Sequence, residues 1–245
     1  MTAGRLAADP MFLSVVMPAY NEEDAIETVV RDHFQLLEKL GDQVPRWEVV
    51  CVDDASRDRT PEILRVLSER EPRLRLVRHE TNQGIFAAFT RCYQEARGTH
   101  IYATGSDGQW PPENLVLMLN RLSTGADLVV GVRGNRHEVY TAARRVISYC
   151  FNRLPPLLFG VAVEDAGSCK LGVRAIFLFD LISKSPFFEA ERIIRASREG
   201  YRVDFVPIRF AARACGEATG GSWKNIRDSL RDLLRCLIVY GVRRR

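Results

Sequence analysis

The stretch LSVVMPAYNEEDAIETVVRDHFQLLEKL, residues 13–40, decides the fold class of this chain. Residues 13–20 form a short apolar run rich in valine, and such a run beside a proline-containing turn predicts a buried strand. Residues 22–40 repeat apolar side chains with a helical period and stop at Gly41, which predicts an amphipathic helix. A buried strand followed at once by a helix is the first half of a βαβ unit, so this stretch indicates an α/β fold.

The same alternation continues along the chain. Further strands are expected at 47–56, 74–80, 100–107 and 126–133, with helices at 60–70, 82–98 and 111–125 between them. Continuous apolar strands that alternate with helices are typical of a parallel sheet covered on both faces. We therefore expect a single Rossmann-like α/β domain with a mostly parallel central sheet flanked by helices.

Composition and length agree with an ordinary globular protein. The chain has 245 residues, of which 46% are hydrophobic and 27% charged, enough for one large domain or at most two small ones. The six cysteines and four histidines show no metal-binding spacing, and scattered cysteines of this kind indicate free thiols in a reducing cytoplasm. The N-terminus MTAGRLAADP lacks the apolar core of a signal peptide, and no apolar run reaches the roughly 20 residues of a membrane span. We therefore expect a cytoplasmic protein, soluble or peripheral on the inner face of the membrane.

Basic residues gather at the C-terminus, although the net charge of the whole chain is only +4. Within residues 223–245, Arg227, Arg231 and Arg235 recur at every fourth position beside a leucine-rich stripe. This pattern predicts a basic amphipathic helix, and it suits a helix in a membrane interface and a helix packed on the sheet equally well. The anionic partner that we expect for this charge is a membrane or a phosphate group, and not a nucleic acid.

A polar cluster follows each expected strand. In chain order these clusters read PAYNEED, DDASRD, HETNQG, GSDGQW and RGNR. Because the carboxyl ends of parallel strands meet at one edge of a sheet, we expect the clusters to converge there. They bring the carboxylates of Asp53, Asp54 and Asp107 near arginines, a combination that suits a nucleotide diphosphate with a divalent cation. The chain contains neither GxGxxG nor GxxxxGK[ST], which excludes the usual dinucleotide-binding and P-loop sites.

Seven segments of the chain together carry a resemblance to a known family. They are VVMPAYNEE, VVCVDDASRDRT, NQGIFAAF, SDGQWPPE, DLVVGVR, DAGSCKLGVRAIF and EGYRVDFVPIRFAARACGEATGG. In this order they resemble the motifs of glycosyltransferase family 2, and in particular its dolichol-phosphate mannosyltransferase-like branch. The resemblance implies a GT-A fold over residues 13–222, between an N-terminal extension at 1–12 and the basic helix at 223–245.

One of these segments implies a metal site. SDGQWPPE matches a stretch that usually reads DxDxQxPPE and holds Mg²⁺ or Mn²⁺ against the two phosphates of a sugar nucleotide. The resemblance therefore assigns Asp107 and the amide oxygen of Gln109 as metal ligands, with Asp107 also catalytic. Gly105 departs from the pattern, because the family usually has its first aspartate at this position. Either Asp107, Gln109 and water suffice to hold the metal, or metal affinity is reduced.

The resemblance also assigns residues to the sugar nucleotide and the acceptor. Tyr20 is expected to stack on the base, and Asp54 to accept a hydrogen bond from the base or ribose. Asp165 is expected to orient the acceptor as a second catalytic residue, although Cys169 and Lys170 depart from the family's usual glycine and aromatic residue there. The expected nucleotide-sugar-binding residues are Pro18, Tyr20, Glu22, Val52, Asp54, Ser106, Arg133, Lys170 and Arg213.

The implied function is inverting transfer of a sugar from a nucleotide-diphosphate sugar to a polyprenyl phosphate of the dolichyl or undecaprenyl type at a membrane surface. A phosphate acceptor is already ionised at neutral pH, whereas a hydroxyl acceptor needs a general base, for which Asp165 is the first candidate and Glu164 the second. Two alternatives stay open. One is transfer to a soluble or polysaccharide hydroxyl, and the other is a catalytically weak nucleotide-sugar-binding protein, which Gly105 alone supports. The nucleotide, the sugar and the oligomeric state are not decided by the sequence.

Overall fold

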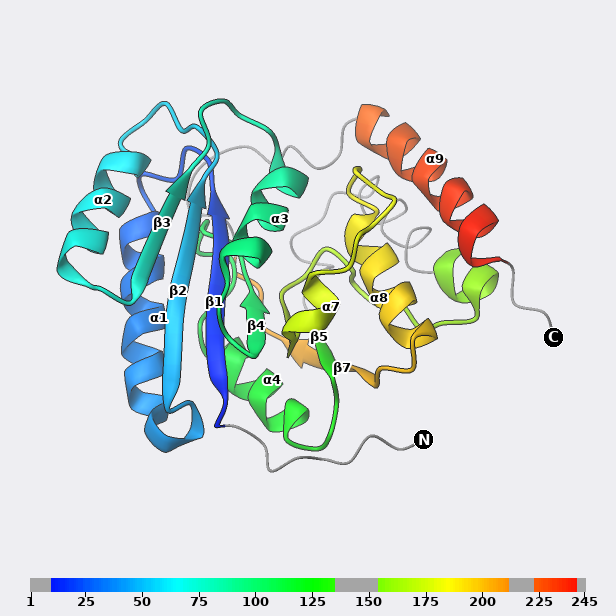
Figure 1. The fold of residues 1–245 in the computed structure, drawn as a ribbon, viewed down its shortest axis with the longest axis horizontal. Helices are drawn as coiled ribbons and strands as arrows, with labels where there is room; N and C mark the ends of the chain where they lie inside the picture. Colours follow the sequence, from blue (N-terminus) through cyan, green and yellow to red (C-terminus); the bar gives the residue numbers. More distant parts are fainter. Residues whose placement is uncertain (1–9, 135–153, 212–222, 242–245) are drawn as a thin grey trace.

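The computed structural model describes residues 10–134, 154–211 and 223–241. Within these ranges a seven-stranded sheet forms the centre of the molecule, in the order β3-β2-β1-β4-β6-β5-β7 (Figure 1). Its strands are β1 (Phe12–Ala19), β2 (Arg46–Asp53), β3 (Leu74–Arg78), β4 (His100–Ala103), β5 (Leu128–Arg133), β6 (Lys170–Val173) and β7 (Val203–Ile208). Strand pairs in this part of the chain are parallel except those of β6, which runs antiparallel to β4 and β5. The mostly parallel α/β sheet that the sequence predicts is confirmed.

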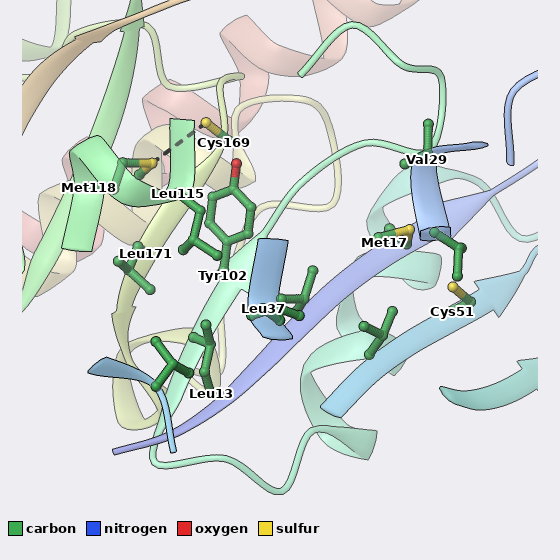
Figure 2. Packing of buried hydrophobic residues seen from close by; sticks show 14 of the residues in the cluster. Leu13, Met17, Val29, Leu37, Cys51, Tyr102, Leu115, Met118, Cys169 and Leu171 are labelled. Carbon is green, nitrogen blue, oxygen red and sulfur yellow. Dashed lines mark hydrogen bonds between the residues drawn. The ribbon is translucent and has the colours of Figure 1, made fainter. Parts of the chain in front are cut away.

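Helices cover both faces of this sheet. They are α1 (Ile26–Leu40), the 3-10 helix η1 (Gly41–Gln43), α2 (Thr60–Arg70), α3 (Ile85–Glu95), α4 (Asn114–Leu122), α7 (Arg174–Phe177), α8 (Phe188–Arg198) and α9 (Trp223–Tyr240), with a short helix over residues 154–159. Strand β1 shows how the two layers divide, because successive side chains point to opposite faces. Leu13, Val15 and Met17 belong to the core cluster on the side of α1, α2 and α4, and Figure 2 shows Leu13 and Met17 in it, while Val16 belongs to the second cluster, on the side of α3. Burial on both faces explains the continuous apolar run of β1.

Expected and observed elements differ mainly at their ends. Helix α2 occupies 60–70 as expected, whereas the helix expected at 22–40 begins only at Ile26. The backbone N–H groups of Ala25 and Ile26 both donate to the carbonyl of Glu22 (3.0 and 2.9 Å), so the residues before Ile26 form a turn. The polar residues after β1 thereby stay outside regular structure, at the edge where ligands bind to such sheets.

Strand β6 is an element that sequence patterns do not reveal. Its sequence KLGV is short and begins with lysine, so it shows no run or alternation typical of a strand. Gly172 allows the neighbouring strand to approach closely, because a Cβ there would lie 2.6 Å from the carbonyl oxygen of Asp127. The strand carries Lys170 into the sheet between β4 and β5, five positions after the expected acceptor residue Asp165.

The cysteines that the structure describes, Cys51, Cys92, Cys169 and Cys236, are buried free thiols, while Cys150 and Cys215 lie outside the described residues. Burial raises the pKa of Cys51 to about 12 and that of Cys169 to about 11. Thiols with such pKa values stay protonated at neutral pH, so these side chains act as small apolar core residues.

Helix α9 docks on the domain through one face. Asp232 accepts hydrogen bonds from the backbone N–H groups of Lys184 and Ser185 (3.2 and 3.1 Å), and the hydroxyl of Tyr240 donates to Glu191 (2.8 Å). The helix therefore lies outside α8, at the end of the molecule away from α1 and α2, and not on the sheet itself (Figure 1). Residues 242–245 of the expected basic segment lie outside the described residues.

The opposite face of α9 exposes apolar and basic side chains together. Leu230, Leu234 and Ile238 follow one another at four-residue intervals and are 42%, 60% and 83% exposed. Beside them stand the exposed side chains of Arg227, Arg231 and Arg235. No helix within 10–134, 154–211 and 223–241 combines the length and apolar character that a bilayer crossing requires.

Burial of His33 in α1 makes the stability of the fold depend on pH. Its Nδ1 bonds the carbonyl of Val29 (2.8 Å), and burial lowers its pKa below the usual 6.5. The unfolded chain therefore takes up a proton at pH values where the folded protein does not, so stability is full above about pH 6.5 and falls as pH decreases towards the lowered pKa. We expect urea unfolding at pH 7.5 and 5.5 to show a larger loss for wild type than for His33→Gln, by up to about 1.4 kcal/mol. Equal losses of stability in the two proteins would contradict this expectation. Burial also lowers the pKa of His100, which accounts for the pH dependence of stability that both proteins share.

Candidate functional site

The loops that follow β1 and β2 interlock at the carboxyl edge of the sheet. The N–H of Asn21 donates to Ser56 Oγ (3.0 Å), and the N–H of Arg57 donates to Asn21 Oδ1 (2.9 Å). The N–H of Glu22 donates to Thr60 Oγ1 (2.8 Å). Asn21 adopts a left-handed φ of 55°, which short amide side chains tolerate better than most. The two polar clusters thus meet where the parallel strand ends predict.

The residues expected to frame the base lie at different depths. Tyr20 is 40% exposed at the edge of the sheet, so its ring is available for stacking. The backbone of Pro18 is joined to the loop after β4, because Ser106 Oγ donates to the Pro18 carbonyl (2.8 Å). The side chain of Val52 is fully buried in the core, where it packs beneath the edge and does not line it.

Asp54 is a buried carboxylate that holds the start of α3. His79 Nδ1 and the N–H of Gln83 lie 2.7 and 2.9 Å from its Oδ1, and the N–H of Gly84 donates to Oδ2 (2.8 Å). Gly84 has a φ of +86°, a conformation that favours glycine, so the turn can aim its N–H groups at one carboxylate. The contact with His79 is not evident in the sequence, where the histidines show no spacing of functional significance.

The loop that carries Asp107 is tied to the end of the described 154–211 segment. The N–H of Gln109 donates to Asp107 Oδ1 (3.1 Å). Gln109 also pairs with Ala211 through two bonds, from its Nε2 to the Ala211 carbonyl (3.3 Å) and from the Ala211 N–H to its own carbonyl (2.9 Å). Both predicted metal ligands therefore share one hydrogen-bonded turn.

A second pair of bonds strengthens this tie. The buried amide of Asn114 donates to the Arg209 carbonyl (2.8 Å) and accepts the Arg209 N–H (3.0 Å). Between the two pairs, the rings of Trp110 and Phe210 contact each other with their centroids 4.7 Å apart. The Asp107 loop and residues 209–211 therefore form one unit.

Trp110 packs against Gly105, where the family usually has its first aspartate. A Cβ at Gly105 would lie 2.9 Å from Trp110 Cδ1, 3.0 Å from its Nε1 and 3.2 Å from Asp107 Oδ1. Real Cβ atoms do not approach ring atoms this closely, so the indole occupies the space that a side chain at 105 would enter. A side chain at position 105 and the indole in its present position therefore exclude each other.

Arg133 and Asp165 form an ion pair in the same region. The backbone N–H and Nε of Arg133 donate to Asp165 Oδ2 (2.9 and 2.8 Å), and the guanidinium also contacts Oδ1. The guanidinium carbon lies 5.4 Å from the centre of the Trp110 ring and 5.0 Å from that of Phe210. Two predicted residues, one for the donor and one for the acceptor, are thus brought into direct contact.

Lys170 points into the interior and not towards this cluster. Its Nζ donates to the Ser168 carbonyl (2.8 Å) and pairs with Glu189 Oε2 (3.0 Å), while the hydroxyl of Tyr93 donates to Glu189 Oε1 (3.1 Å). Burial alone would raise the pKa of Glu189, but the charges of Lys170 and Arg192 hold it below its usual value. The geometry gives Lys170 the role of fixing the backbone between Asp165 and β6, a role that sequence reasoning misses because Glu189 is distant along the chain.

The oxygen atoms near Asp107 are the donor set for the metal site that the resemblance implies. Within residues 10–134, 154–211 and 223–241 no group of three or more histidine, cysteine or acidic side chains is arranged to hold a metal ion. Asp107 lines an open hollow of about 540 Å³ between its loop and α1, together with Asp24, Asp32 and Glu113. One carboxylate and one amide oxygen fit a divalent cation that takes its other ligands from phosphate and water. Arg213, which is predicted to bind the nucleotide sugar, lies outside the described residues.

Comparison with known proteins identifies the family. The family model for glycosyl transferase family 2 matches residues 14–184. A dolichyl-phosphate hexose transferase of Haloferax volcanii is 33% identical over 204 residues, which cover 82% of this chain and 84% of that protein. An undecaprenyl-phosphate 4-deoxy-4-formamido-L-arabinose transferase of Edwardsiella ictaluri is 28% identical over 236 residues, 95% of this chain and 70% of that protein.

Solved structures support the same fold at lower identity. Mannosyl-3-phosphoglycerate synthase from Rubrobacter xylanophilus superposes with a TM-score of 0.71 at 16% identity, covering 94% of this chain and 74% of that one. Glucosyl-3-phosphoglycerate synthase from Mycobacterium tuberculosis, in complex with Mn²⁺ and UDP, gives 0.68 at 20% identity over 96% of this chain and 80% of that one. With a family model that spans most of the chain and a relative 33% identical, this glycosyltransferase belongs to glycosyl transferase family 2, in the branch of the dolichyl- and undecaprenyl-phosphate sugar transferases.

Proposed function

We propose that the protein transfers a sugar from a nucleotide-diphosphate sugar to a polyprenyl phosphate, with inversion at the anomeric carbon. The curated relatives at 33% and 28% identity are named for transfer to dolichyl and undecaprenyl phosphates, which supports this acceptor. Two proteins of similar fold, one with Mn²⁺ and UDP and one with Mn²⁺ and GDP-Man, support the class of donor and a divalent cation.

The ion pair between Arg133 and Asp165 is the observation that favours a phosphate over a hydroxyl acceptor. A hydroxyl must lose its proton to a general base, and Asp165 is the candidate that the resemblance provides. Three donors of Arg133 bind this carboxylate, which orients it but occupies the oxygens that a base would use. An ionised phosphate oxygen can attack the anomeric carbon without such a base while the bond to the diphosphate breaks.

The donor half of the mechanism rests on the Asp107 loop. Asp107 and Gln109 are the residues that would hold Mg²⁺ or Mn²⁺, which would stabilise the charge of the leaving diphosphate. The bonds of Gln109 to Ala211 keep this loop fixed before the donor arrives, so little ordering is needed on binding. Arg133, stacked beside Trp110 of the same loop, lies between the donor side and the acceptor residue Asp165.

The outward face of α9 supports peripheral contact with a membrane. Leu230, Leu234 and Ile238 are exposed beside three arginines, an arrangement that suits the boundary between headgroups and acyl chains. A lipid-phosphate acceptor is presented at that boundary. The same helix is anchored to the domain by Asp232 and Tyr240, so its contact with lipid would bring the whole site to the surface.

Replacement of Asp107 tests the donor site. Asp107→Asn removes the carboxylate of the predicted metal-binding loop, and we expect kcat/KM for Mn²⁺-dependent release of nucleotide diphosphate to fall by at least about a hundredfold. Asp24→Asn, an exposed acid that lines the same hollow, is the matched control and should keep its activity. Near-full activity of Asp107→Asn would show that the metal is held elsewhere.

The packing of Trp110 against Gly105 predicts how the missing aspartate can be restored. Gly105→Asp alone should cost about 1–3 kcal/mol of stability, because its Cβ would overlap the indole. In Gly105→Asp/Trp110→Ala we expect that cost to be largely removed and the affinity for Mn²⁺ to rise above that of Trp110→Ala. Thermal unfolding and Mn²⁺ titration of the four proteins form a double-mutant cycle. If the two substitutions are simply additive in stability, the proposed overlap is wrong.

A vesicle flotation assay tests α9. Replacing Arg227, Arg231 and Arg235 with glutamine should weaken binding to anionic vesicles by about 3 kcal/mol at low salt, because each basic residue near such a surface contributes about 1 kcal/mol. The matched control replaces three exposed arginines elsewhere on the domain that also have acidic neighbours, Arg31, Arg65 and Arg91. Their replacement with glutamine should leave flotation unchanged. Failure of the wild type to float with anionic vesicles would rule out the interfacial role.

A further inference from the structure

Asp54 lies where the donor's base is expected, and its carboxylate is already engaged by the fold. Its N–H donates to the carbonyl of Ala19 (2.9 Å), which fixes Asp54 at the joint carboxyl end of β1 and β2, next to Tyr20. The residue is 3% exposed, so any group that bonds it must come to a fixed position. The hydrogen-bond acceptor positions that remain open on the carboxylate therefore determine which ligand groups Asp54 can bind.

Counting hydrogen bonds leaves one such acceptor site. An ionised carboxylate has about four lone-pair positions, two on each oxygen. Oδ1 accepts from His79 Nδ1 (2.7 Å) and from the Gln83 N–H (2.9 Å), which fills it. Oδ2 accepts from the Gly84 N–H (2.8 Å), and among the residues that the structure describes no further donor reaches it. One position on Oδ2 is left for a ligand.

Nucleobases differ in how many donors they present to a carboxylate. Guanine offers its N1–H and its 2-amino group side by side, and pairing both requires an open position on each oxygen. Uracil offers a single N3–H and requires one. We propose that Asp54, with Oδ1 filled by His79, selects a uridine-diphosphate sugar over a guanosine-diphosphate sugar, a specificity that rests on the proposed function of the site.

His79 is the positioning residue in this selection. The bonds from Gln83 and Gly84 come from the backbone and persist with any side chain, whereas the bond from His79 depends on its imidazole. The backbone N–H of His79 donates to the Asp53 carbonyl (2.9 Å), so the imidazole ring is held at the end of β3 beside Asp54. Removing the imidazole opens a position on Oδ1 and allows the two-point pairing that guanine needs.

Titration calorimetry with UDP and GDP in the presence of Mn²⁺ tests the proposal directly. We expect the wild type to bind UDP at least about tenfold more tightly than GDP, since one guanine donor stays unpaired. In His79→Leu the ratio should fall by about tenfold, mainly through tighter binding of GDP. His79→Asn carries an amide nitrogen near the place of Nδ1 and should restore the preference for UDP. Glu80→Gln, at the exposed neighbouring position, should behave as wild type.

The outcomes separate this inference from the function on which it rests. GDP binding as tightly as UDP to the wild type would overturn the inference while leaving a nucleotide-sugar transferase in place. An unchanged ratio in folded His79→Leu, checked by circular dichroism, would overturn the role of His79. Binding of neither nucleotide by a folded wild type would overturn the proposed function itself. The wild-type comparison needs no variant, so it decides the specificity even if His79→Leu fails to fold.

Discussion

Parallel pairing of β1 with β2 on one side and β4 on the other is the constraint on which the rest of the structure depends. Because these three strands run in the same direction, their carboxyl ends meet, and the loops that follow them must share one edge. Two further hydrogen bonds hold the loops in line after the strands end. They run from the Asp54 N–H to the Ala19 carbonyl and from Ser106 Oγ to the Pro18 carbonyl. The positions of Tyr20, Asp54 and Ser106 at one edge follow from that alignment.

Buried carboxylates hold the loops at this edge in place. Asp54 accepts hydrogen bonds from the turn before α3, and Asp165 pairs with Arg133. Glu189 pairs with Lys170 and Arg192. An ionised side chain in the interior is tolerated only when hydrogen bonds or opposite charges compensate its burial. These contacts favour a fixed arrangement for an electrostatic reason, since each partner lost weakens the compensation of a buried carboxylate.

Sequence patterns were sufficient to place strands β1 to β5 and the polar edge, because these depend on periodicity and on strand direction, but they did not predict β6 or β7. They could not reveal which side chains pair. Lys170 appears in the sequence as a cation near an acceptor segment, but Glu189 turns it inward. His79 shows no informative spacing, yet it contacts Asp54. The reason is physical: a period reports which face of an element is buried, whereas a partner comes from tertiary packing between distant segments.

Residues 209–211 lie beyond the stretch that the family model matches, which ends at 184. Nevertheless, they supply the backbone groups that satisfy Gln109 and Asn114, and the ring that contacts Trp110. A fragment cut at the limit of the family match would leave the amide of Asn114, which is 1% exposed in the intact fold, without its partners. The smallest part of this chain able to keep its Asp107 loop in shape is thus longer than the stretch that the family model matches, and it must extend through β7 to Ala211.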